Sequence, residues 1–463
     1  MHTTGLALAL GILLTFPALT RSATPESHVL DVQWATEGTV GKVTIAFDNA
    51  VNYRTTGSPS SVVVDVWPAQ LTQWPSLEIA HPFVRHVWVN QIADNLARIR
   101  IDLAQPARYK AFLRTDPHRL IVLVIPPWMA TAELPASLAY ERLRVGTGIG
   151  YTTAHVLRVD PRDPNVEIRP GLAANMMTGS ESTSIVATRN DALAAINGGY
   201  FAGPGLPLGL VVINGELVSL PVNRRSVFAI TRAGQPIIET FEFQGYVYTP
   251  DSVRLWVSSV NQPPVAGGVA IFTKLYGPLI PPHVLAAVVR GEVVESLTWG
   301  RIMIPDDGYV LTVAGKDTDL IQKFIRPGQR LRVTLQLTPD LDVVSALGGG
   351  PRLVKDGKEF IPFAWEWFTP HFNSIRTARS AIGITGGGKV ILVTVDARKR
   401  HDTGMTLHEL AQLLIRLGAR EAMNLDGGGS ATMVVGGRIV SAPADGFERP
   451  IASTLLVLRR PGP

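Results

Sequence analysis

The sequence predicts a β-rich α+β fold, in which an N-terminal antiparallel β-sandwich precedes a mixed α/β catalytic domain with few helices. Two observations lead to this prediction. Over residues 28–127, apolar and polar residues alternate in short runs that Gly, Pro, Asn and Asp separate, which is typical of half-buried antiparallel strands. Beyond residue 140 the chain continues mainly as short strand-like runs, and only two stretches have helical periodicity.

Length and composition limit the class of protein. A chain of 463 residues is too long for one ordinary core, and 46% apolar with 17% charged residues indicates a folded protein of two or three domains. The 43 basic and 38 acidic residues give a net charge of +5 without any Lys/Arg cluster, so nucleic acid is not an expected partner. The absence of cysteine excludes disulfides and thiolate metal sites.

The N-terminus has the plan of a secretory signal over residues 1–23. An apolar run from Gly5 to Leu19, interrupted by Thr15 and Pro17, is followed by small and polar residues. The start of the chain lacks Lys and Arg, so a buried or frayed N-terminal segment is the alternative. No other apolar run is long enough to cross a bilayer, so we expect an exported protein of the cell envelope or extracellular space without a transmembrane span.

The predicted sandwich spans residues 28–127. Its period-two runs are centred on Val43–Phe47, Val62–Val66, Ile99–Leu103 and Leu120–Val124. The strand order, with ARIRIDL at 97–103 ahead of Tyr109 and a strand at 119–125, resembles the AMIN domain of cell-wall amidases and secretins. The resemblance implies a module that binds cell-wall glycan, and a generic sandwich without a ligand is the alternative. Three tryptophans would stack on sugar rings if exposed and otherwise belong to the core: Trp67, Trp74 and Trp88.

A Pro-containing segment, residues 128–140, breaks the periodicity and is the predicted linker to a second domain at 141–461. Helices are expected at 180–188 and at 406–417, the second with a capping box in which Thr406 precedes Glu409. Strands at 390–395 and 421–425 flank this second helix in a βαβ-like unit. Because ligands in such units lie at the carboxyl ends of the strands, Asp396 and Asp426 are placed at a candidate site.

Two glycine-rich loops carry the strongest functional signal. In residues 424–433, NLDGGGSATM, a carboxylate is followed by three glycines and a hydroxyl group between two apolar runs. Glycines leave the backbone bare, so a ligand could lie against the amides beside an anion. Residues 195–201, AINGGYF, repeat the same pattern. Two such loops predict a ligand site.

Together with GGGPRLV at 348–354 and RTARSAIG at 376–383, these loops resemble the phosphodiester glycosidase family. The likeness runs from about Arg142 to Arg460 and is strongest over 376–434. It implies a hydrolase that cleaves a sugar 1-phosphodiester, with an N-acetylhexosamine as the sugar, and hence a glycan or sugar-phosphate polymer as the partner.

The resemblance and the residue chemistry assign catalytic roles to two aspartates and an arginine. Asp426 is the first candidate, and an Asx-turn acid that only bonds the next amides is the alternative. Asp396 is the second carboxylate that glycosidases generally need, or a strand-end acid that pairs with Arg398 or caps a turn. The family usually has Gly where this chain has Ala397. Arg379 matches the family's arginine, and its guanidinium suits a bidentate grip on phosphate.

The expected substrate-binding residues frame the sugar: Asn197, Gly198, Gly199, Arg398, Gly427, Gly428, Gly429 and Ser430. Asn197 offers a donor and an acceptor to a hydroxyl or acetamido group, or else it only serves a tight turn. Ser430 could bond the substrate or cap an element. The acetamido oxygen of the sugar could itself act as nucleophile, which would leave one Asp to polarise it.

No cofactor and no metal site are predicted. No His pair has the i, i+4 spacing of a helical zinc site, and no loop has EF-hand spacing, although a weakly held Ca²⁺ or Mg²⁺ stays open. Two rival classes also remain open at this point: a non-catalytic carbohydrate-binding envelope protein, and a structural partner in exopolysaccharide assembly.

Overall fold

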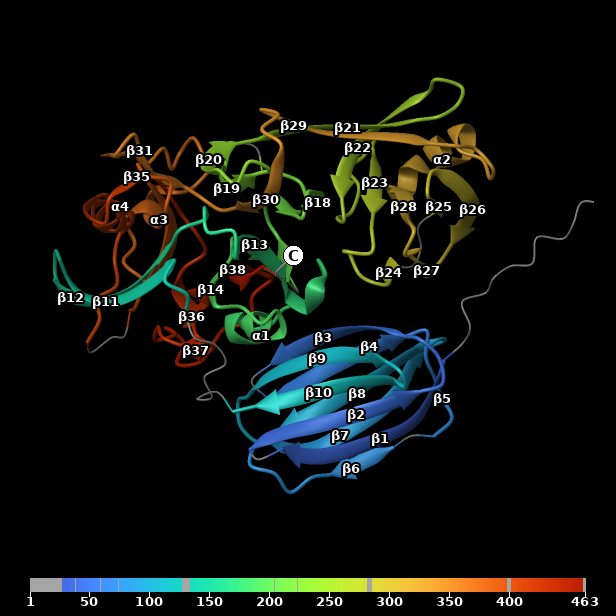
Figure 1. Ribbon diagram of the computed structural model, residues 1–463. Coiled ribbons are helices and arrows are strands. Elements are labelled where there is room, and N and C mark those ends of the chain that lie inside the picture. The colour runs from blue at the N-terminus through green and yellow to red at the C-terminus, as the bar shows by residue number, and fades with distance from the viewer. Residues whose placement is uncertain are drawn as a thin grey trace, which may run out of the picture.

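The computed structural model describes residues 27–37, 39–58, 60–73, 75–126, 134–203, 205–222, 224–280, 285–397 and 401–460. The expected signal segment at 1–23, Trp74, Arg398 and residues 128–133 of the expected linker lie outside the described residues. Figure 1 shows the sandwich below a group of central sheets, with a further β-lobe at the upper right. No helix in the described ranges is long and apolar enough to cross a membrane.

The sandwich consists of two five-stranded sheets that share one apolar core. The first sheet has the order β5 (Gln70–Leu71), β1 (His28–Glu37), β2 (Val40–Phe47), β10 (His118–Ile125), β9 (Arg108–Thr115). The second has the order β3 (Asn52–Ser58), β4 (Ser61–Trp67), β8 (Leu96–Leu103), β7 (Val84–Ala93), β6 (Ser76–Glu78). The four predicted runs are confirmed as β2, β4, β8 and β10, because their alternate side chains all enter the core.

The two described tryptophans of interest have different environments. Trp67 is buried, which confirms the core alternative for that residue. Trp88 is 42% exposed, stacks on His86 at 3.8 Å between ring centroids, and donates a hydrogen bond to Asp102. Trp88 is therefore a surface aromatic.

The central part of the molecule contains three sheets. The first is β11 (Leu138–Thr147), β12 (Gly150–Val159), β34 (Val390–Val395), β33 (Arg379–Thr385), β35 (Ala419–Asn424), β31 (Arg352–Lys355), β32 (Lys358–Glu359). The second is β13 (Val166–Leu172), β38 (Ser453–Arg459), β14 (Ala194–Asn197), β36 (Met433–Val435), β37 (Arg438–Ile439). The third is β18 (Glu216–Ser219), β17 (Val211–Ile213), β30 (Val343–Gly348), β19 (Ser226–Thr231), β20 (Pro236–Thr240).

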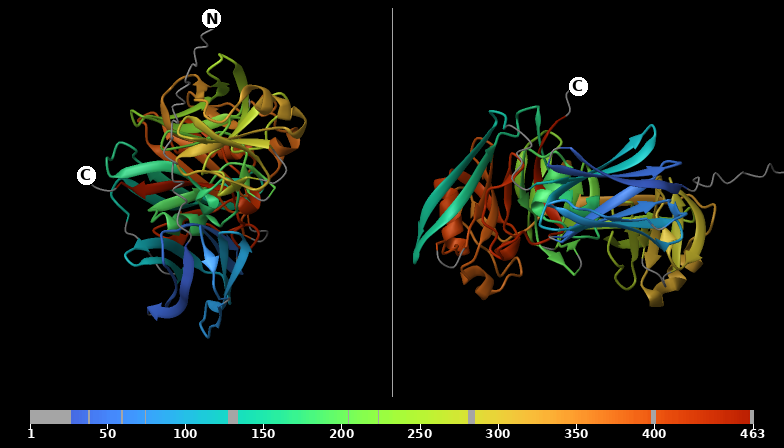
Figure 2. Two further views of the ribbon diagram at one scale, coloured as in Figure 1. Left: turned by 90° about the vertical axis from the view of Figure 1, so that its right-hand side faces the viewer. Right: turned by 90° about the horizontal axis from the view of Figure 1, so that it is seen from below.

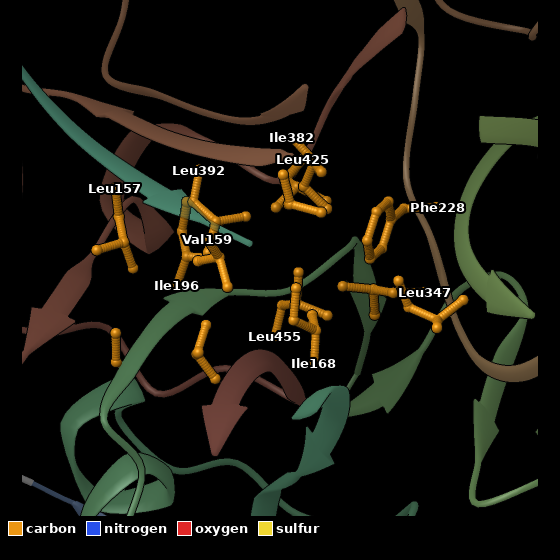
Figure 3. Packing of buried hydrophobic residues seen from close by; sticks show 14 of the residues in the cluster. Leu157, Val159, Ile168, Ile196, Phe228, Leu347, Ile382, Leu392, Leu425 and Leu455 are labelled. Atoms are coloured by element: carbon orange, nitrogen blue, oxygen red, sulfur yellow. The ribbon is translucent and has the colours of Figure 1, made fainter. Parts of the chain in front are cut away.

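One hydrophobic core joins these three sheets. Figure 3 shows Leu392 and Ile382 of the first sheet facing Ile196 and Leu455 of the second, with Phe228 of the third beside them. Asn197 is the last residue of β14, and Leu425 directly follows β35. Because both strands contribute to this core, the core fixes the positions at which the two glycine-rich loops begin.

The upper-right lobe has its own core and a seven-stranded sheet. The strand order is β26 (Val293–Trp299), β25 (Leu285–Arg290), β28 (Gly308–Val313), β23 (Val269–Phe272), β22 (Arg254–Val260), β21 (Glu242–Tyr248), β29 (Arg332–Thr338). The remaining described strands form two short antiparallel pairs: β24 (Leu279–Ile280) with β27 (Ile302–Met303), and β15 (Phe201–Ala202) with β16 (Leu206–Pro207). Figure 2, right, shows this lobe at the end of the molecule opposite β11 and β12.

The described helices are few, as predicted for a β-rich fold. They are α1 (Thr183–Arg189), α2 (Thr318–Phe324), α3 (Pro370–Ser374), α4 (Leu407–Arg416) and the 3₁₀ turns η1 (Ala173–Asn175), η2 (Gly315–Asp317) and η3 (Gly428–Ser430). The capping box of α4 is confirmed, since Thr406 and Glu409 bond each other's backbone amides. Helix α1 begins later than expected because Glu181 pairs with Ile451 in an isolated β-bridge.

Strand β33 lies between β34 and β35 and is antiparallel to both. The two outer strands therefore run in the same direction, and α4 connects them across one intervening strand. This arrangement is the predicted βαβ-like unit, with β33 lying between its two strands. The carboxyl ends of β34 and β35 still reach the same sheet edge, where β33 begins at Arg379.

A buried polar network joins the sandwich to the central sheets through α1, which lies directly above β3 and β9 (Figure 1). Glu181 is fully buried and accepts hydrogen bonds from the hydroxyls of Thr55, at 3.2 Å, and Tyr109. Its second carboxylate oxygen pairs with Arg189 and accepts a bond from the Ala174 amide. The sandwich is consequently packed against the rest of the molecule through a satisfied buried charge.

Candidate active site

Three segments that the sequence singled out meet at Asp426. The amide of Leu425 donates to Ser380 at 2.8 Å, and the amide of Gly428 donates to Ala378 at 2.8 Å. The amide of Asp426 donates to the carbonyl of Gly198 at 3.3 Å. The glycine turn after β35, the loop after β14 and the start of β33 therefore form one site.

The carboxyl group of Asp426 is half-buried and accepts a hydrogen bond from the Gly427 amide at 2.9 Å. Burial raises the pKa of Asp426 above its ordinary value, while the Ser430 hydroxyl, the Gly427 amide and the charge of Arg449 oppose that shift. A carboxyl group whose pKa is raised toward neutrality is suited to proton transfer.

The three glycines after Asp426 make room for protein groups. A Cβ at Gly427 would lie 2.7 Å from the carbonyl oxygen of Ala378, and one at Gly429 would lie 2.1 Å from the Asp445 carboxylate and 2.2 Å from the Arg449 guanidinium. Gly428 has a φ of 59°, in the left-handed region. The expectation that these glycines bare the backbone for a ligand is thus corrected for Gly427 and Gly429, which accommodate the protein itself.

The other glycine loop is packed in the same way. A Cβ at Gly198 would lie 2.6 Å from the carbonyl oxygen of Ser453, and one at Gly199 would lie 2.1 Å from that of Gly348. These two glycines therefore let backbone segments approach each other, and neither offers the predicted open contact to a sugar.

Asn197 is fully buried, and protein groups occupy its polar atoms. Its side-chain nitrogen donates to the carbonyl of Asp426 at 2.7 Å, and its oxygen accepts from the Ser380 hydroxyl at 2.6 Å and the Thr432 amide at 3.2 Å. The predicted contact between Asn197 and substrate is corrected accordingly: the residue holds the Asp426 turn against β33.

Asp396 lies at the same sheet edge as Asp426, but its carboxylate is bonded to other protein groups. The residue is 4% exposed, and one oxygen lies 3.1 Å from His155 Nε2 while the other accepts from the Ala442 amide at 2.9 Å. The Nδ1 of His155 lies 2.9 Å from the hydroxyl of Tyr140. Asp396 is thus not the second free carboxylate that the sequence suggested, and its proposed partner Arg398 lies outside the described residues.

Arg379 is 1% exposed and supports the neighbouring loops. Its Nε donates to Met405 at 3.0 Å, and its Nη2 donates to the carbonyls of Ile375 and Phe372. Burial lowers its pKa to about 10, so it stays charged at neutral pH. Only Nη1 has no hydrogen bond to the described residues, so the expected bidentate grip on phosphate is reduced to a contact through one nitrogen.

Tyr200, which sequence reasoning passed over, lies at the centre of the site. Its hydroxyl donates to the Gly350 carbonyl at 2.7 Å and accepts from the Asn424 side chain at 2.9 Å. Burial raises its pKa, and the charge of Asp426 adds to that shift, whereas Arg379 and Arg225 oppose it. The Tyr200 ring is therefore close to one acidic and two basic groups.

Arg225 is a second missed residue. Its guanidinium carbon lies 4.5 Å from the centre of the Phe368 ring and 5.5 Å from that of Tyr200. Among the described residues it has no acidic partner, and its buried Nε makes no hydrogen bond. An arginine held on aromatic rings without a counterion is a candidate anion site. In sequence it is one of two adjacent arginines, and nothing local distinguishes it from Arg224.

Arg449 is the third missed residue. It pairs with Asp445 at 2.8 Å, lies over Gly429 and lowers the pKa of Asp426. Arg376, by contrast, pairs with Glu409 at 2.7 Å. Arg449 thus lies beside Asp426, whereas Arg225 and Arg379 lie near Tyr200. The described residues contain no group of three or more His, Asp or Glu that could hold a metal ion.

The fold and the site define a β-rich protein in which the half-buried carboxyl group of Asp426 lies on a glycine turn beside Arg449, with Arg225 and Arg379 near Tyr200. Residues 283–458 match the model of the phosphodiester glycosidase family. Asn197, Tyr200 and Arg225 precede the matched residues, so part of the site comes from outside them.

Two curated relatives share parts of the chain. The SPbeta prophage-derived uncharacterized protein YomE of Bacillus subtilis is 32% identical over 124 residues, which are 26% of this chain and 19% of that protein. The bovine N-acetylglucosamine-1-phosphodiester alpha-N-acetylglucosaminidase is 39% identical over 74 residues, 16% of this chain and 14% of that protein. The chain therefore spans less than a fifth of the length of each of these relatives.

Two solved structures share the fold over most of the chain. A hypothetical protein from Synechocystis superposes with a TM-score of 0.63 at 22% identity, over 94% of this chain and 81% of that one. A putative exported protein from Burkholderia pseudomallei gives a TM-score of 0.57 at 20% identity, over 92% and 99% of the two chains. At this level of identity the likeness establishes the fold alone.

Proposed function

We propose that this protein hydrolyses the glycosidic bond of a sugar 1-phosphodiester, with Asp426 as its working carboxyl group. The observation that carries the proposal is the half-buried Asp426 carboxyl with its raised pKa, set on a glycine turn beside Arg449. The family match over residues 283–458 supports the same reaction class.

The phosphate is proposed to lie between Arg225 and the Nη1 of Arg379, on the Tyr200 side of the site. A phosphodiester carries one negative charge, and Arg225 has a guanidinium without an acidic partner among the described residues. The charges of Arg379 and Arg225 both lower the pKa of the Tyr200 hydroxyl, which supports a position of both guanidinium groups near Tyr200. Charge-assisted hydrogen bonds to phosphate from both groups would orient the substrate.

The mechanism needs little acid catalysis, because the leaving group is a phosphate monoester that departs as a stable anion. Both oxygens of Asp396 are bonded inside the protein, so Asp396 does not supply the second carboxylate of a two-carboxylate mechanism. We therefore favour participation by the substrate: the acetamido oxygen attacks C1, the bond from C1 to the phosphate oxygen breaks, and Asp426 takes the acetamido N–H proton. Water then attacks C1 as the ring C1–O bond of the oxazoline breaks. Asp426 returns its proton to the acetamido nitrogen, and the proton that the water loses leaves to solvent.

The substrate is proposed to be a glycopolymer of the cell envelope, and the protein to be exported. The apolar N-terminal run and the fold shared with a putative exported protein support export. Attachment of the sandwich to cell-wall glycan remains a proposal that rests on the AMIN-like strand pattern and on the exposed ring of Trp88.

Hydrolysis of N-acetylglucosamine 1-(methyl phosphate) by the full chain tests the proposal. We expect methyl phosphate and N-acetylglucosamine as products of the unchanged protein, and a loss of about 10²- to 10⁴-fold in rate for Asp426→Asn. Asp342→Asn removes an exposed acid that pairs with Arg232 at the surface and should retain full activity. Binding of the substrate without turnover by both the unchanged protein and Asp426→Asn would instead identify a carbohydrate-binding protein.

A further inference from the structure

A cavity of about 270 Å³ lies between the sandwich and the central sheets. The sandwich forms one wall with residues that include Ser58, Ala107 and Arg108, and the central part forms the other with α1 and the segment 443–450. The volume is just below the range of pockets that hold drug-sized ligands, so it suits a ligand of about one sugar ring.

The lining combines apolar faces with a few polar groups. Phe447 is 51% exposed, and Ile439, Pro443 and Pro450 add further apolar surface. The carboxylate of Glu448 accepts a hydrogen bond from the Ser184 amide at 3.0 Å and another from the Ser184 hydroxyl. A pyranose ring has the matching pattern, since its C–H faces are apolar and its edges carry hydroxyls.

The same short segment forms a wall of the cavity and a wall of the catalytic site. Asp445 and Arg449 lie against Gly429 of the catalytic turn, whereas Phe447 and Glu448 line the cavity. Neighbouring residues of one segment therefore serve both places. The segment connects the cavity to the turn that carries Asp426.

Both ends of this segment are anchored. The amide of Ala442 is held by Asp396 at 2.9 Å, and Ile451 exchanges two backbone hydrogen bonds with Glu181, at 3.0 and 2.8 Å. Glu181 in turn binds Thr55 of the sandwich. The walls of the cavity are consequently fixed before a ligand arrives, which reduces the entropy lost on binding.

We propose that this interdomain cavity is a second sugar subsite, which takes one uncharged sugar residue of the glycan whose phosphodiester is cleaved at Asp426. The ring of Phe447 packs against a face of the sugar, and Glu448, Ser182 and Ser184 receive its hydroxyls. The identity of the glycan rests on the proposed function, but the existence of the subsite does not. The sandwich thereby becomes part of substrate recognition.

Binding of N,N′-diacetylchitobiose, which carries no phosphate, tests the subsite by ligand-observed NMR on the full chain in an Asp426→Asn background. We expect Phe447→Ala to weaken binding by about tenfold. Ala107→Phe, which fills the cavity from the sandwich side, should do the same. Phe360→Ala removes an aromatic residue of similar exposure that does not line the cavity, and it should leave binding unchanged. Equal melting temperatures establish that the variants are folded.

The outcomes separate this inference from the proposed function. Arg225→Leu should abolish binding of methyl phosphate at the proposed phosphate site, while binding of chitobiose persists. That result supports the subsite whether or not hydrolysis is observed. The inference is overturned, even in an active hydrolase, if the parent does not bind chitobiose. It is also overturned if Phe447→Ala and Ala107→Phe bind chitobiose as tightly as their parent. Binding of octyl alcohol in the cavity without any sugar binding would likewise overturn it in favour of an apolar ligand.

Discussion

The side-chain amide of Asn197 donates a hydrogen bond to the backbone carbonyl of Asp426 at 2.7 Å, across 229 residues of sequence. The same side chain also accepts bonds from Ser380 and Thr432. One buried amide thus ties the end of β14 to the Asp426 turn and to β33. The position of the Asp426 carboxyl depends on this connection.

Asn197→Ala should lower both stability and turnover. Removing the amide leaves buried donors and acceptors unpaired, which costs about 1–3 kcal/mol for each such group. Because Asn197 is fully buried and touches only protein, we expect kcat to fall while KM stays nearly constant. Asn90→Ala, at an exposed strand position, is the matched control and should change neither quantity. A rise in KM alone would show that Asn197 contacts substrate after all.

The acid limb of the pH profile should lie above the ordinary aspartate pKa of 3.8. Burial raises the pKa of Asp426, and the mechanism needs its ionised form, so kcat/KM falls as pH drops through that raised value. Arg449→Ala removes a charge that lowers this pKa, and it should therefore move the acid limb to higher pH. A shift to lower pH, or none, would argue against Asp426 as the titrating group.

Arg225 and Arg224 provide a matched pair for the phosphate site. Arg224 is exposed and lies 4.1 Å from the ring centre of Trp365, whereas Arg225 packs on Phe368 inside the site. Arg225→Gln should raise KM for the phosphodiester by about tenfold or more, since hydrogen bonds to charged groups contribute about 1.5–3 kcal/mol. Inhibition by inorganic phosphate should weaken in parallel. Equal effects of Arg224→Gln would remove the case for a specific phosphate contact.

The glycine turn predicts opposite outcomes at two neighbouring positions. At Gly427 a methyl group meets the backbone of Ala378, which has no room to move, so Gly427→Ala should lower the melting temperature. At Gly429 the methyl group meets the ends of the Asp445 and Arg449 side chains, which can swing away. Gly429→Ala should therefore keep the stability and shift the acid limb as Arg449→Ala does. Thermal unfolding and pH profiles of both variants check this contrast.

Asp396→Asn and Asp426→Asn should separate stability from catalysis. Asp396 holds His155 and the Ala442 amide, so Asp396→Asn should lower the melting temperature and leave the chemical step within about tenfold. Asp426 binds its proton more tightly in the folded state than in the unfolded chain, so its contribution to stability decreases as pH rises through the window between the two pKa values. At neutral pH Asp426→Asn should accordingly be as stable as the parent or more so. Loss of activity in Asp396→Asn as severe as in Asp426→Asn would restore the two-carboxylate mechanism.

The strands and α4 were predicted from the sequence because their signals, alternation of apolar residues and a capping box, lie within the elements themselves. Period-two alternation is enough to place β2, β4, β8 and β10, and the Thr406–Glu409 capping box marks the start of α4 within one residue. Asp426 was placed at a strand end for the same reason. The roles of the glycines and of Asn197 could not be predicted, because they depend on residues such as Ser453 and Arg449 that approach from other parts of the chain.

Arg225 and Asp396 illustrate the same limit at the site. Arg225 stands out only because it has no acidic partner among the residues that the structure describes, and this is a property of its surroundings. The commitment of Asp396 to His155 arises because β12 pairs with β34, and this pairing joins residues 241 positions apart. Sequence alone ranks Asp426 first and Asp396 second, but it does not reveal that the Asp396 carboxylate is bonded inside the protein.

The most direct measurement of the central claim is hydrolysis of N-acetylglucosamine 1-(methyl phosphate) in ¹⁸O-labelled water, followed by ³¹P NMR and mass spectrometry. Cleavage between C1 and the phosphate oxygen at the Asp426 site predicts unlabelled methyl phosphate, with the label entering the sugar, and no reaction in Asp426→Asn. Labelled phosphate, or methanol together with N-acetylglucosamine 1-phosphate as products, would contradict the account by placing the chemistry at phosphorus.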